Sequence, residues 1–309
     1  MDKILVNIDF KHDTAVIVEK AAQLAIEHSA VVELFCCCYN RAIVQEYMFD
    51  KAGAQKAEHA YVRQIESQLE VLSDALADKG INASFDACWN RYTDEGVMRK
   101  VLRYEPDLLM HAVQPHSRIG HYLFASLDWQ IARQSPVPVL FVKQKPWTAI
   151  MRIAACIDPF HKDDLQGQLD REILTRSQIF SKGGMSELRV LHCFNTLPHE
   201  AIFDEHLVTD YEALQKRIAK EHITRCNDVL AEFGLSTEDS VVDVLKGEAD
   251  SLISDYAVDK SIDIIAMGGV ARSVLDRLLL GSTMESVVDN VDCDVLVVKR
   301  PDFLCPVSE

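Results

Sequence analysis

The sequence lacks any apolar run that approaches the roughly 18 residues needed to span a bilayer. It is also poor in positive charge, because 32 Lys and Arg stand against 48 Asp and Glu and leave a formal net charge of -16. Such a surface repels phosphate backbones and anionic lipid head groups. We therefore expect neither nucleic acid nor a membrane among the partners. The first residues show no basic segment followed by a long apolar one, as a signal peptide would, so we expect a cytoplasmic protein.

No cysteine pair has the C-x-x-C spacing of zinc and redox motifs, although the chain has nine cysteines. Most of them lie in apolar runs that are typical of buried strands, which predicts reduced core residues. The triplet Cys36–Cys38 does not by itself predict a zinc site, because zinc needs about four converging ligands and consecutive strand residues point to opposite faces. His111, His116 and His121 are spaced around a predicted loop, but they form an incomplete ligand set. We expect no metal site.

The familiar nucleotide motifs are also missing, since the chain has neither a Walker loop nor a G-x-G-x-x-G turn. No Ser-His-Asp or Cys-His arrangement can be assembled from one sequence, because such groups meet in space. We predict no catalytic residue.

A duplicated pattern organises the chain. The segment from Asp107 to Lys143 aligns without a gap with the segment from Asp263 to Lys299, and VLFVK lies over VLVVK. The chain start KILVNIDF likewise matches RIAACIDPF, with Asp9 over Asp158. Such self-similarity indicates an internal repeat. It predicts two domains, residues 1–146 and 147–309.

Each copy alternates apolar, strand-like runs with helical patterns. Continuous apolar strands separated by helices predict a parallel sheet that is covered on both faces. Ligand sites in such sheets lie at the carboxyl ends of the strands, near the point where the strand order reverses. The predicted strands are Ile4–Asp9, Val31–Cys38, Asn82–Cys88, Leu108–Val113 and Val137–Val142 in the first copy, and Ile153–Asp158, Glu187–Phe194, Ser240–Leu245, Ile264–Met267 and Val295–Val298 in the second.

The second copy carries a candidate phosphate cradle. Its fourth strand runs into MGGVARSVLDRLLLGST, which places Gly268 at the strand exit and Gly281 directly before Ser282 and Thr283. Glycine lets the backbone approach a ligand, and a hydroxyl at a helix start lies beside N–H groups that favour anions. This stretch therefore predicts an anion site.

The same spacing resembles the signature of the universal stress protein family, G-2x-G-9x-G-(S/T). Gly268 takes the first glycine, Ala271 stands where the second is expected, and Gly281 with Ser282 complete the pattern. The length, the two copies and SLDW in the first copy make the chain similar to the tandem, E-type members of that family.

The resemblance implies two Rossmann-like domains of the adenine nucleotide alpha hydrolase type, each a five-stranded parallel sheet, packed as a pseudo-dimer through their last strands. It also implies a role in stress survival and an adenine nucleotide, ATP with Mg²⁺ or AMP, in the C-terminal domain. A homodimer of tandem chains would use the same kind of surface. The residues that the resemblance assigns to the nucleotide are Asp158, Cys193, Phe194, Gly268, Ala271, Gly281, Ser282 and Thr283, and Arg272 lies on the segment that links the glycines.

The first copy departs from the signature. Ala112, Pro115, Ala125 and Ser126 occupy its four motif positions. Proline removes a donor N–H, and Ala125 brings a Cβ to a glycine position. We expect no nucleotide in this copy.

Simpler interpretations remain open for each candidate. Asp9 and Asp158 would also be explained by turns at their strand ends, and Gly281 with Ser282 by an ordinary turn and helix cap. Arg272 faces either phosphate or solvent. Three functions follow: a nucleotide-binding regulatory protein, a slow ATPase, or a nucleotide-free scaffold for an apolar small molecule or a protein partner.

Overall fold

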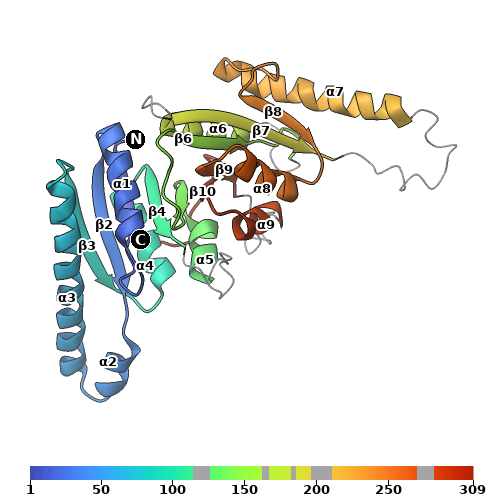
Figure 1. Cartoon of the computed structure of the whole chain (residues 1–309). Coiled ribbons are helices and arrows are strands. Elements are labelled where there is room, and N and C mark those ends of the chain that lie inside the picture. The colour runs from blue at the N-terminus through green and yellow to red at the C-terminus, as the bar shows by residue number, and fades with distance from the viewer. Residues whose placement is uncertain (114–125, 162–166, 182–185, 196–210, 270–281, 309) are drawn as a thin grey trace. The chain divides into compact units, whose positions relative to one another are not determined.

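The computed structural model describes residues 1–113, 126–161, 167–181, 186–195, 211–269 and 282–308, and these form two compact units. The first contains Met1–Pro146 and Phe303–Glu309, and the second contains Trp147–Asp302. The sequence-based division differs for residues 303–309, which belong to the first unit because their contacts are with it. Figure 1 shows the elements of both units.

The first unit is a parallel five-stranded sheet in the order β3-β2-β1-β4-β5, so the strand order reverses between β1 and β4. Its strands are β1 (Lys3–Asn7), β2 (Val31–Cys38), β3 (Ala83–Trp89), β4 (Leu108–Ala112) and β5 (Val139–Val142). Its helices are α1 (Ala15–His28), α2 (Arg41–Glu46), α3 (Lys51–Ala77), α4 (Thr93–Tyr104) and α5 (Ser126–Gln134). Right-handed crossovers place α1 and α3 on one face of the sheet and α4 and α5 on the other.

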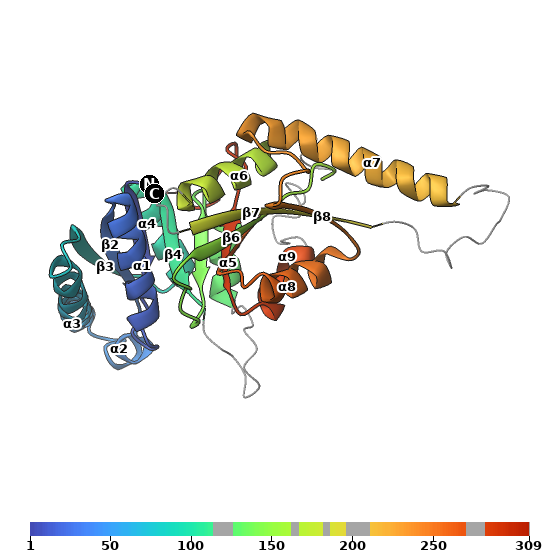
Figure 2. The ribbon, with the colours of Figure 1, turned by 45° about the horizontal axis from the view of Figure 1, so that its top comes forward.

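The second unit repeats this plan in the order β10-β9-β6-β7-β8, again all parallel, with the reversal between β6 and β9. Its strands are β6 (Met151–Cys156), β7 (Ser186–Phe194), β8 (Val242–Lys246), β9 (Ile264–Gly268) and β10 (Asp294–Val298). Its helices are α6 (Gln168–Phe180), α7 (Tyr211–Leu230), the short 3-10 helix η2 (Ala231–Phe233), α8 (Ala249–Asp259) and α9 (Ser282–Asn290). Figure 2 shows the long helix α7 beside this sheet.

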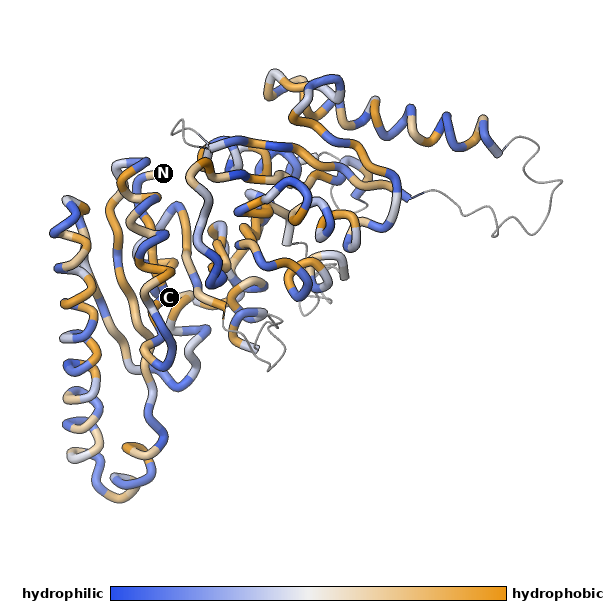
Figure 3. Tube along the Cα trace, in the orientation of Figure 1, coloured by the Kyte–Doolittle hydropathy of each residue, from blue (hydrophilic) through white to orange (hydrophobic). Residues whose placement is uncertain are grey.

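The cores lie where the apolar runs predict them. The central strands are hydrophobic along most of their length (Figure 3), and Ile4, Leu5, Leu140, Ile264 and Leu296 are fully buried. Burial on both faces explains why these strands show no polar alternation. The predicted fold class, two Rossmann-like parallel sheets flanked by helices, is confirmed.

Candidate functional site

Asp158 follows β6 and lies at the strand ends of the second unit. Its Oδ1 accepts a hydrogen bond from the Phe160 N–H at 3.2 Å, and its own N–H donates to Asp170 Oδ1 at 2.9 Å. These bonds form a turn of the kind that Asp closes at many strand ends. The residue is also exposed. The turn therefore explains its position, and its exposure leaves the carboxylate within reach of a ligand.

Cys193 and Phe194 end β7, the strand next to β6. Phe194 is buried, and its ring stacks on His222 of α7 with centroids 4.5 Å apart. Cys193 is half-buried, and burial, followed by the charge of Asp158, raises the pKa of its thiol to about 12. Cys193 is thus a neutral thiol near neutral pH, and Phe194 contributes an aromatic surface.

An imidazole pair completes this aromatic surface. His192 Nδ1 lies 3.0 Å from the Ile157 carbonyl oxygen, which can only accept, so this nitrogen carries the proton. His192 Nε2 then accepts from His222 Nδ1 at 2.8 Å. Phe160 packs on the other side of His222, with ring centroids 4.1 Å apart. Sequence reasoning missed the two histidines because β7 and α7 bring them together only in the fold, although strand alternation already places His192 on the same face as Phe194.

Burial keeps this pair neutral. Burial lowers the pKa of His192 against the opposing effects of its backbone bond and of Asp158. Burial, followed by the neighbouring His192, also lowers the pKa of His222, while Asp158 and Glu221 raise it. The pair therefore contributes stability that is fully present above the ordinary histidine pKa of 6.5.

We expect the second unit to lose stability as the pH falls below 6.5. The histidines of the unfolded chain are then protonated, whereas the lowered pKa values of His192 and His222 keep them neutral in the folded chain. Urea unfolding of the full chain between pH 5 and pH 8, followed by hydrogen exchange in β7, measures the effect. His222→Phe retains the ring stack and should flatten the profile. An unchanged profile in this variant would assign the pH dependence to other groups.

The two glycines at the end of β9 lie in close contact with neighbouring side chains. A Cβ added to Gly268 would lie 2.5 Å from Leu169 Cδ2 of α6, and one added to Gly269 would lie 2.7 Å from Val297 Cγ1 of β10. Real side chains do not approach so closely, so a larger residue at either position would have to displace Leu169 or Val297. Gly268 still lies at the strand exit where the motif places it.

The remaining predicted residues are only partly described. Ser282 and Thr283 begin α9, and Thr283 is half-buried. Ala271, Arg272 and Gly281 lie outside the described residues. Ser282 is described by its backbone alone. Among the described candidates, the pairing of β6 with β7 and β9 brings the strand ends that carry Asp158, Phe194 and Gly268 to one edge of the sheet.

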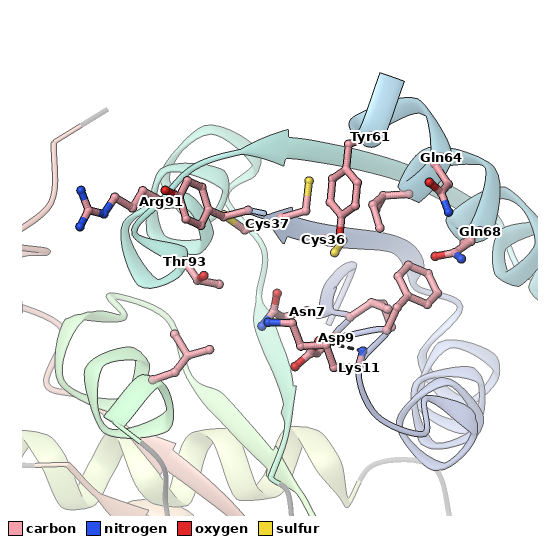
Figure 4. Close-up of a pocket in the computed structure, with 16 residues that line it drawn as sticks. Asn7, Asp9, Lys11, Cys36, Cys37, Tyr61, Gln64, Gln68, Arg91 and Thr93 are labelled. Carbon is pink, nitrogen blue, oxygen red and sulfur yellow. Dashed lines mark hydrogen bonds between the residues drawn. The ribbon is translucent and has the colours of Figure 1, made fainter. Parts of the chain in front are cut away.

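A cavity of about 370 Å³ lies at the corresponding strand ends of the first unit. Figure 4 shows Tyr61, Gln64 and Gln68 of α3 on one side of it, and Asn7 and Asp9 from the end of β1 on another. Asp9 forms a turn like that of Asp158, because its Oδ1 accepts from the Lys11 N–H at 3.0 Å. The other lining residues are Ile8, Phe10, Lys11, Cys36, Cys37, Cys38, Tyr39, Ile65, Arg91, Thr93 and Leu127. Sequence reasoning about Pro115 and Ala125, which lie outside the described residues, did not anticipate this cavity.

A buried chain of hydrogen bonds supports one wall of the cavity. His111 Nε2 lies 2.8 Å from Asp128 Oδ1, and His111 Nδ1 lies 2.8 Å from Asn7 Nδ2. The carboxylate accepts and the amide nitrogen donates, which fixes the tautomer of His111 and the orientation of Asn7. Both nitrogens of His111 are thereby occupied by structural partners. His116 and His121 lie outside the described residues. Among the described residues, no group of three or more His, Cys, Asp or Glu side chains is arranged to hold a metal ion.

The comparisons with known proteins agree with this architecture. A curated relative, Universal stress protein E of Salmonella typhi, is 23% identical over 310 aligned residues, which cover 99% of this chain and 96% of the relative. The equivalent protein of Photorhabdus laumondii is 20% identical and covers 99% and 97% of the two chains. No described helix is both long enough and apolar enough to traverse a bilayer.

Solved structures show the same fold. A putative universal stress protein from Pseudomonas aeruginosa has a TM-score of 0.72 at 24% identity and covers 97% of this chain and 94% of its own. A universal stress protein from Archaeoglobus fulgidus has a TM-score of 0.61 at 16% identity, with 97% of each chain covered. The family model described as "Universal stress protein family" matches residues 1–143 and 179–299. Because these two regions span most of its length, the chain belongs to the universal stress protein family.

Proposed function

We propose that the chain is a stress-response protein that binds an adenine nucleotide, ATP or AMP, in its C-terminal domain. The observation that carries the proposal is the arrangement of strand ends around the β6/β9 reversal. The exposed carboxylate of Asp158, the aromatic surface of Phe194 and His222, and the strand exit at Gly268 belong to this one edge. Ligands of open parallel sheets bind at such an edge.

The described residues fit the two ends of a nucleotide. The half-buried rings of Phe160 and His222, stacked beside Phe194, offer a flat, apolar surface of the kind on which a purine base packs. The N-terminus of α9, which begins at Ser282, favours an anion through its unsatisfied N–H groups. Mg²⁺ would accompany ATP, and the carboxylate of Asp158 is the kind of oxygen ligand that this ion takes. A bound nucleotide would supply a regulatory signal through occupancy rather than a reaction.

Neither nucleic acid nor a membrane is part of the proposal, because the net charge of -16 repels both. The predicted pseudo-dimer of domains and a homodimer of tandem chains stay predictions. Scattering and sedimentation of the full chain would test them.

The experiment that tests the function is the identification of small molecules released when the purified chain is denatured. We expect AMP or ATP in the released fraction. A fraction without adenine nucleotide, from protein that also fails to bind added ATP and AMP, would contradict the proposal.

A specific observation favours a second candidate. The cavity in the first unit has about 370 Å³, which lies in the range of small-molecule sites, and its lining combines aromatic, cysteine and aliphatic side chains with polar and charged ones. This cavity suits a small molecule that is not a nucleotide and that has an apolar part. A released compound other than a nucleotide, lost on Tyr61→Ala and retained in Phe194→Ala, would support this candidate.

We expect any ATP hydrolysis by the chain to be slow. The sequence supplies no Walker lysine, and it fixes the placement of no general base. Release of inorganic phosphate under saturating ATP and Mg²⁺ measures the rate. Turnover in the ordinary enzyme range of roughly 1 to 1000 per second would show that the protein is an enzyme.

A further inference from the structure

Two cysteines face each other across neighbouring strands of the first unit. Cys37 of β2 and Cys88 of β3 are register partners, so their side chains leave the same face of the parallel sheet. The Cys37 thiol donates to the Asn90 carbonyl oxygen at 3.9 Å, and Cys88 is its neighbour on the adjacent strand. Neighbouring strands lie about 4.8 Å apart. A disulfide needs a Cα···Cα separation of about 4.4 to 6.8 Å. The backbone therefore already holds this pair at bridging distance.

The other cysteines of the triplet are directed elsewhere. Strand alternation directs Cys36 and Cys38 to the opposite face, where both line the cavity together with Tyr61 of α3. The Cys38 thiol donates to the Cys88 carbonyl oxygen at 3.3 Å rather than to its sulfur. Cys37 lies on the face covered by α4, where a Cβ on Gly96 would overlap its sulfur. The glycine thus leaves room for this thiol.

Charged side chains of both signs lie on the same face. Lys100 and Arg103 of α4 both bind the carboxylate of Asp86, Lys100 at 2.9 Å and Arg103 at 2.6 Å. The neighbouring Cys37 thiol lowers the pKa of Cys88, with help from Arg103 and Lys100 and against burial and Asp86. The neighbouring Cys88, followed by burial, raises the pKa of Cys37. Of the two, Cys88 is therefore the one that ionises and Cys37 is the one that holds its proton.

The two cysteines differ in how solvent reaches them. Cys88 is half-buried, and Cys37 lines the cavity at the strand ends (Figure 4). A small neutral oxidant fits such a cavity, and a thiolate is the form that it attacks. We propose that Cys37 and Cys88 form a peroxide-sensitive dithiol that closes reversibly to an intramolecular disulfide.

The chemistry balances with hydrogen peroxide as the oxidant. The Cys88 thiolate attacks one peroxide oxygen, the O–O bond breaks, and hydroxide leaves, which gives a sulfenic acid at Cys88. Cys37 then forms the S–S bond and loses its proton, and the sulfenic oxygen leaves as water. The two sulfurs lose two electrons in total, which reduce the peroxide, and a thiol reductant restores both thiols.

Oxidation of the full chain with hydrogen peroxide, followed by alkylation of the remaining thiols, proteolysis and mass spectrometry, tests the proposal. We expect the wild type to lose two of its nine free thiols and to yield one linked peptide pair that contains Cys37 and Cys88. A thiol reductant should restore all nine. Cys36→Ser, a neighbour on the other face, should give the same linked pair. Cys88→Ser should give none.

Cys37→Ser separates the two steps, since it should leave a sulfenic acid at Cys88 that a carbon nucleophile traps. If either serine variant does not fold by circular dichroism, the alanine variant replaces it. Three results would overturn the proposal: a wild type that keeps all its thiols, a link between other cysteines or between chains, or a link in the Cys88 variant.

Discussion

Replacing Lys100 by Ala is expected to cost the first unit about 3 to 5 kcal/mol of unfolding free energy. Lys100 and Glu33 are 6% and 9% exposed, and the ammonium bonds both Glu33 and Asp86. Ser84 Oγ also donates to Glu33 Oε2 at 3.1 Å. Without Lys100, the charge of Glu33 stays buried, and the Ser84 hydroxyl is the hydrogen-bond partner that remains to it among the described residues. An uncompensated buried charge is among the largest single-residue penalties.

Hydrogen exchange of the full chain measures this loss in the amides of Val31–Cys38, which belong to the affected sheet. The matched control is Lys79→Ala, because Lys79 pairs with Glu19 at 2.5 Å on the surface and such pairs contribute less than about 1 kcal/mol. Equal losses in the two variants would contradict the account of a buried ion network. Pairing Lys100→Met with Glu33→Gln should recover part of the stability, because both buried charges are then removed.

Replacing Gly281 by Val is expected to abolish nucleotide binding in the C-terminal domain. The family motif puts a glycine there, and a branched side chain would block the close approach of the phosphates. Ser282→Ala should remove one hydroxyl bond, which costs about 1 kcal/mol or about fivefold in affinity. Calorimetric titration with ATP and AMP measures both effects. Ala125→Val at the matching position of the first copy should change nothing, and an unchanged affinity in Gly281→Val would refute the assignment.

The fold was predictable because strands that are buried on both faces appear in the sequence as continuous apolar runs. Apolar runs such as that of Val31–Cys38 become strands at nearly the predicted bounds. The end of β1 is shorter than predicted because Asp9 leaves the strand to close a turn with Lys11. Asp158 does the same after β6. Strand ends are decided by such local polar bonds, which hydrophobic patterning does not report.

The candidate sites were predictable only where one short segment carries the signal. Gly268 and Ser282 fall within a single stretch of the motif. The stack of Phe194 on His222 joins β7 to a helix well beyond it in the chain, and the bond between Asn7 and His111 joins the first strand to the fourth. Contacts between residues so far apart in the chain cannot be inferred from a single sequence. The cavity in the first unit was missed for the same reason, since elements far apart in the chain line it.

The most direct test of C-terminal nucleotide binding is hydrogen exchange of the wild-type chain with and without saturating ATP or AMP. Binding at the proposed edge predicts slower exchange at the end of β7, in the turn after Asp158 and at Gly268 and Gly269. The amides of Asn7–Asp9 and Cys36–Cys38, beside the cavity of the first unit, should exchange at unchanged rates. Protection of these first-unit amides alone, or of none in either unit, would contradict the account.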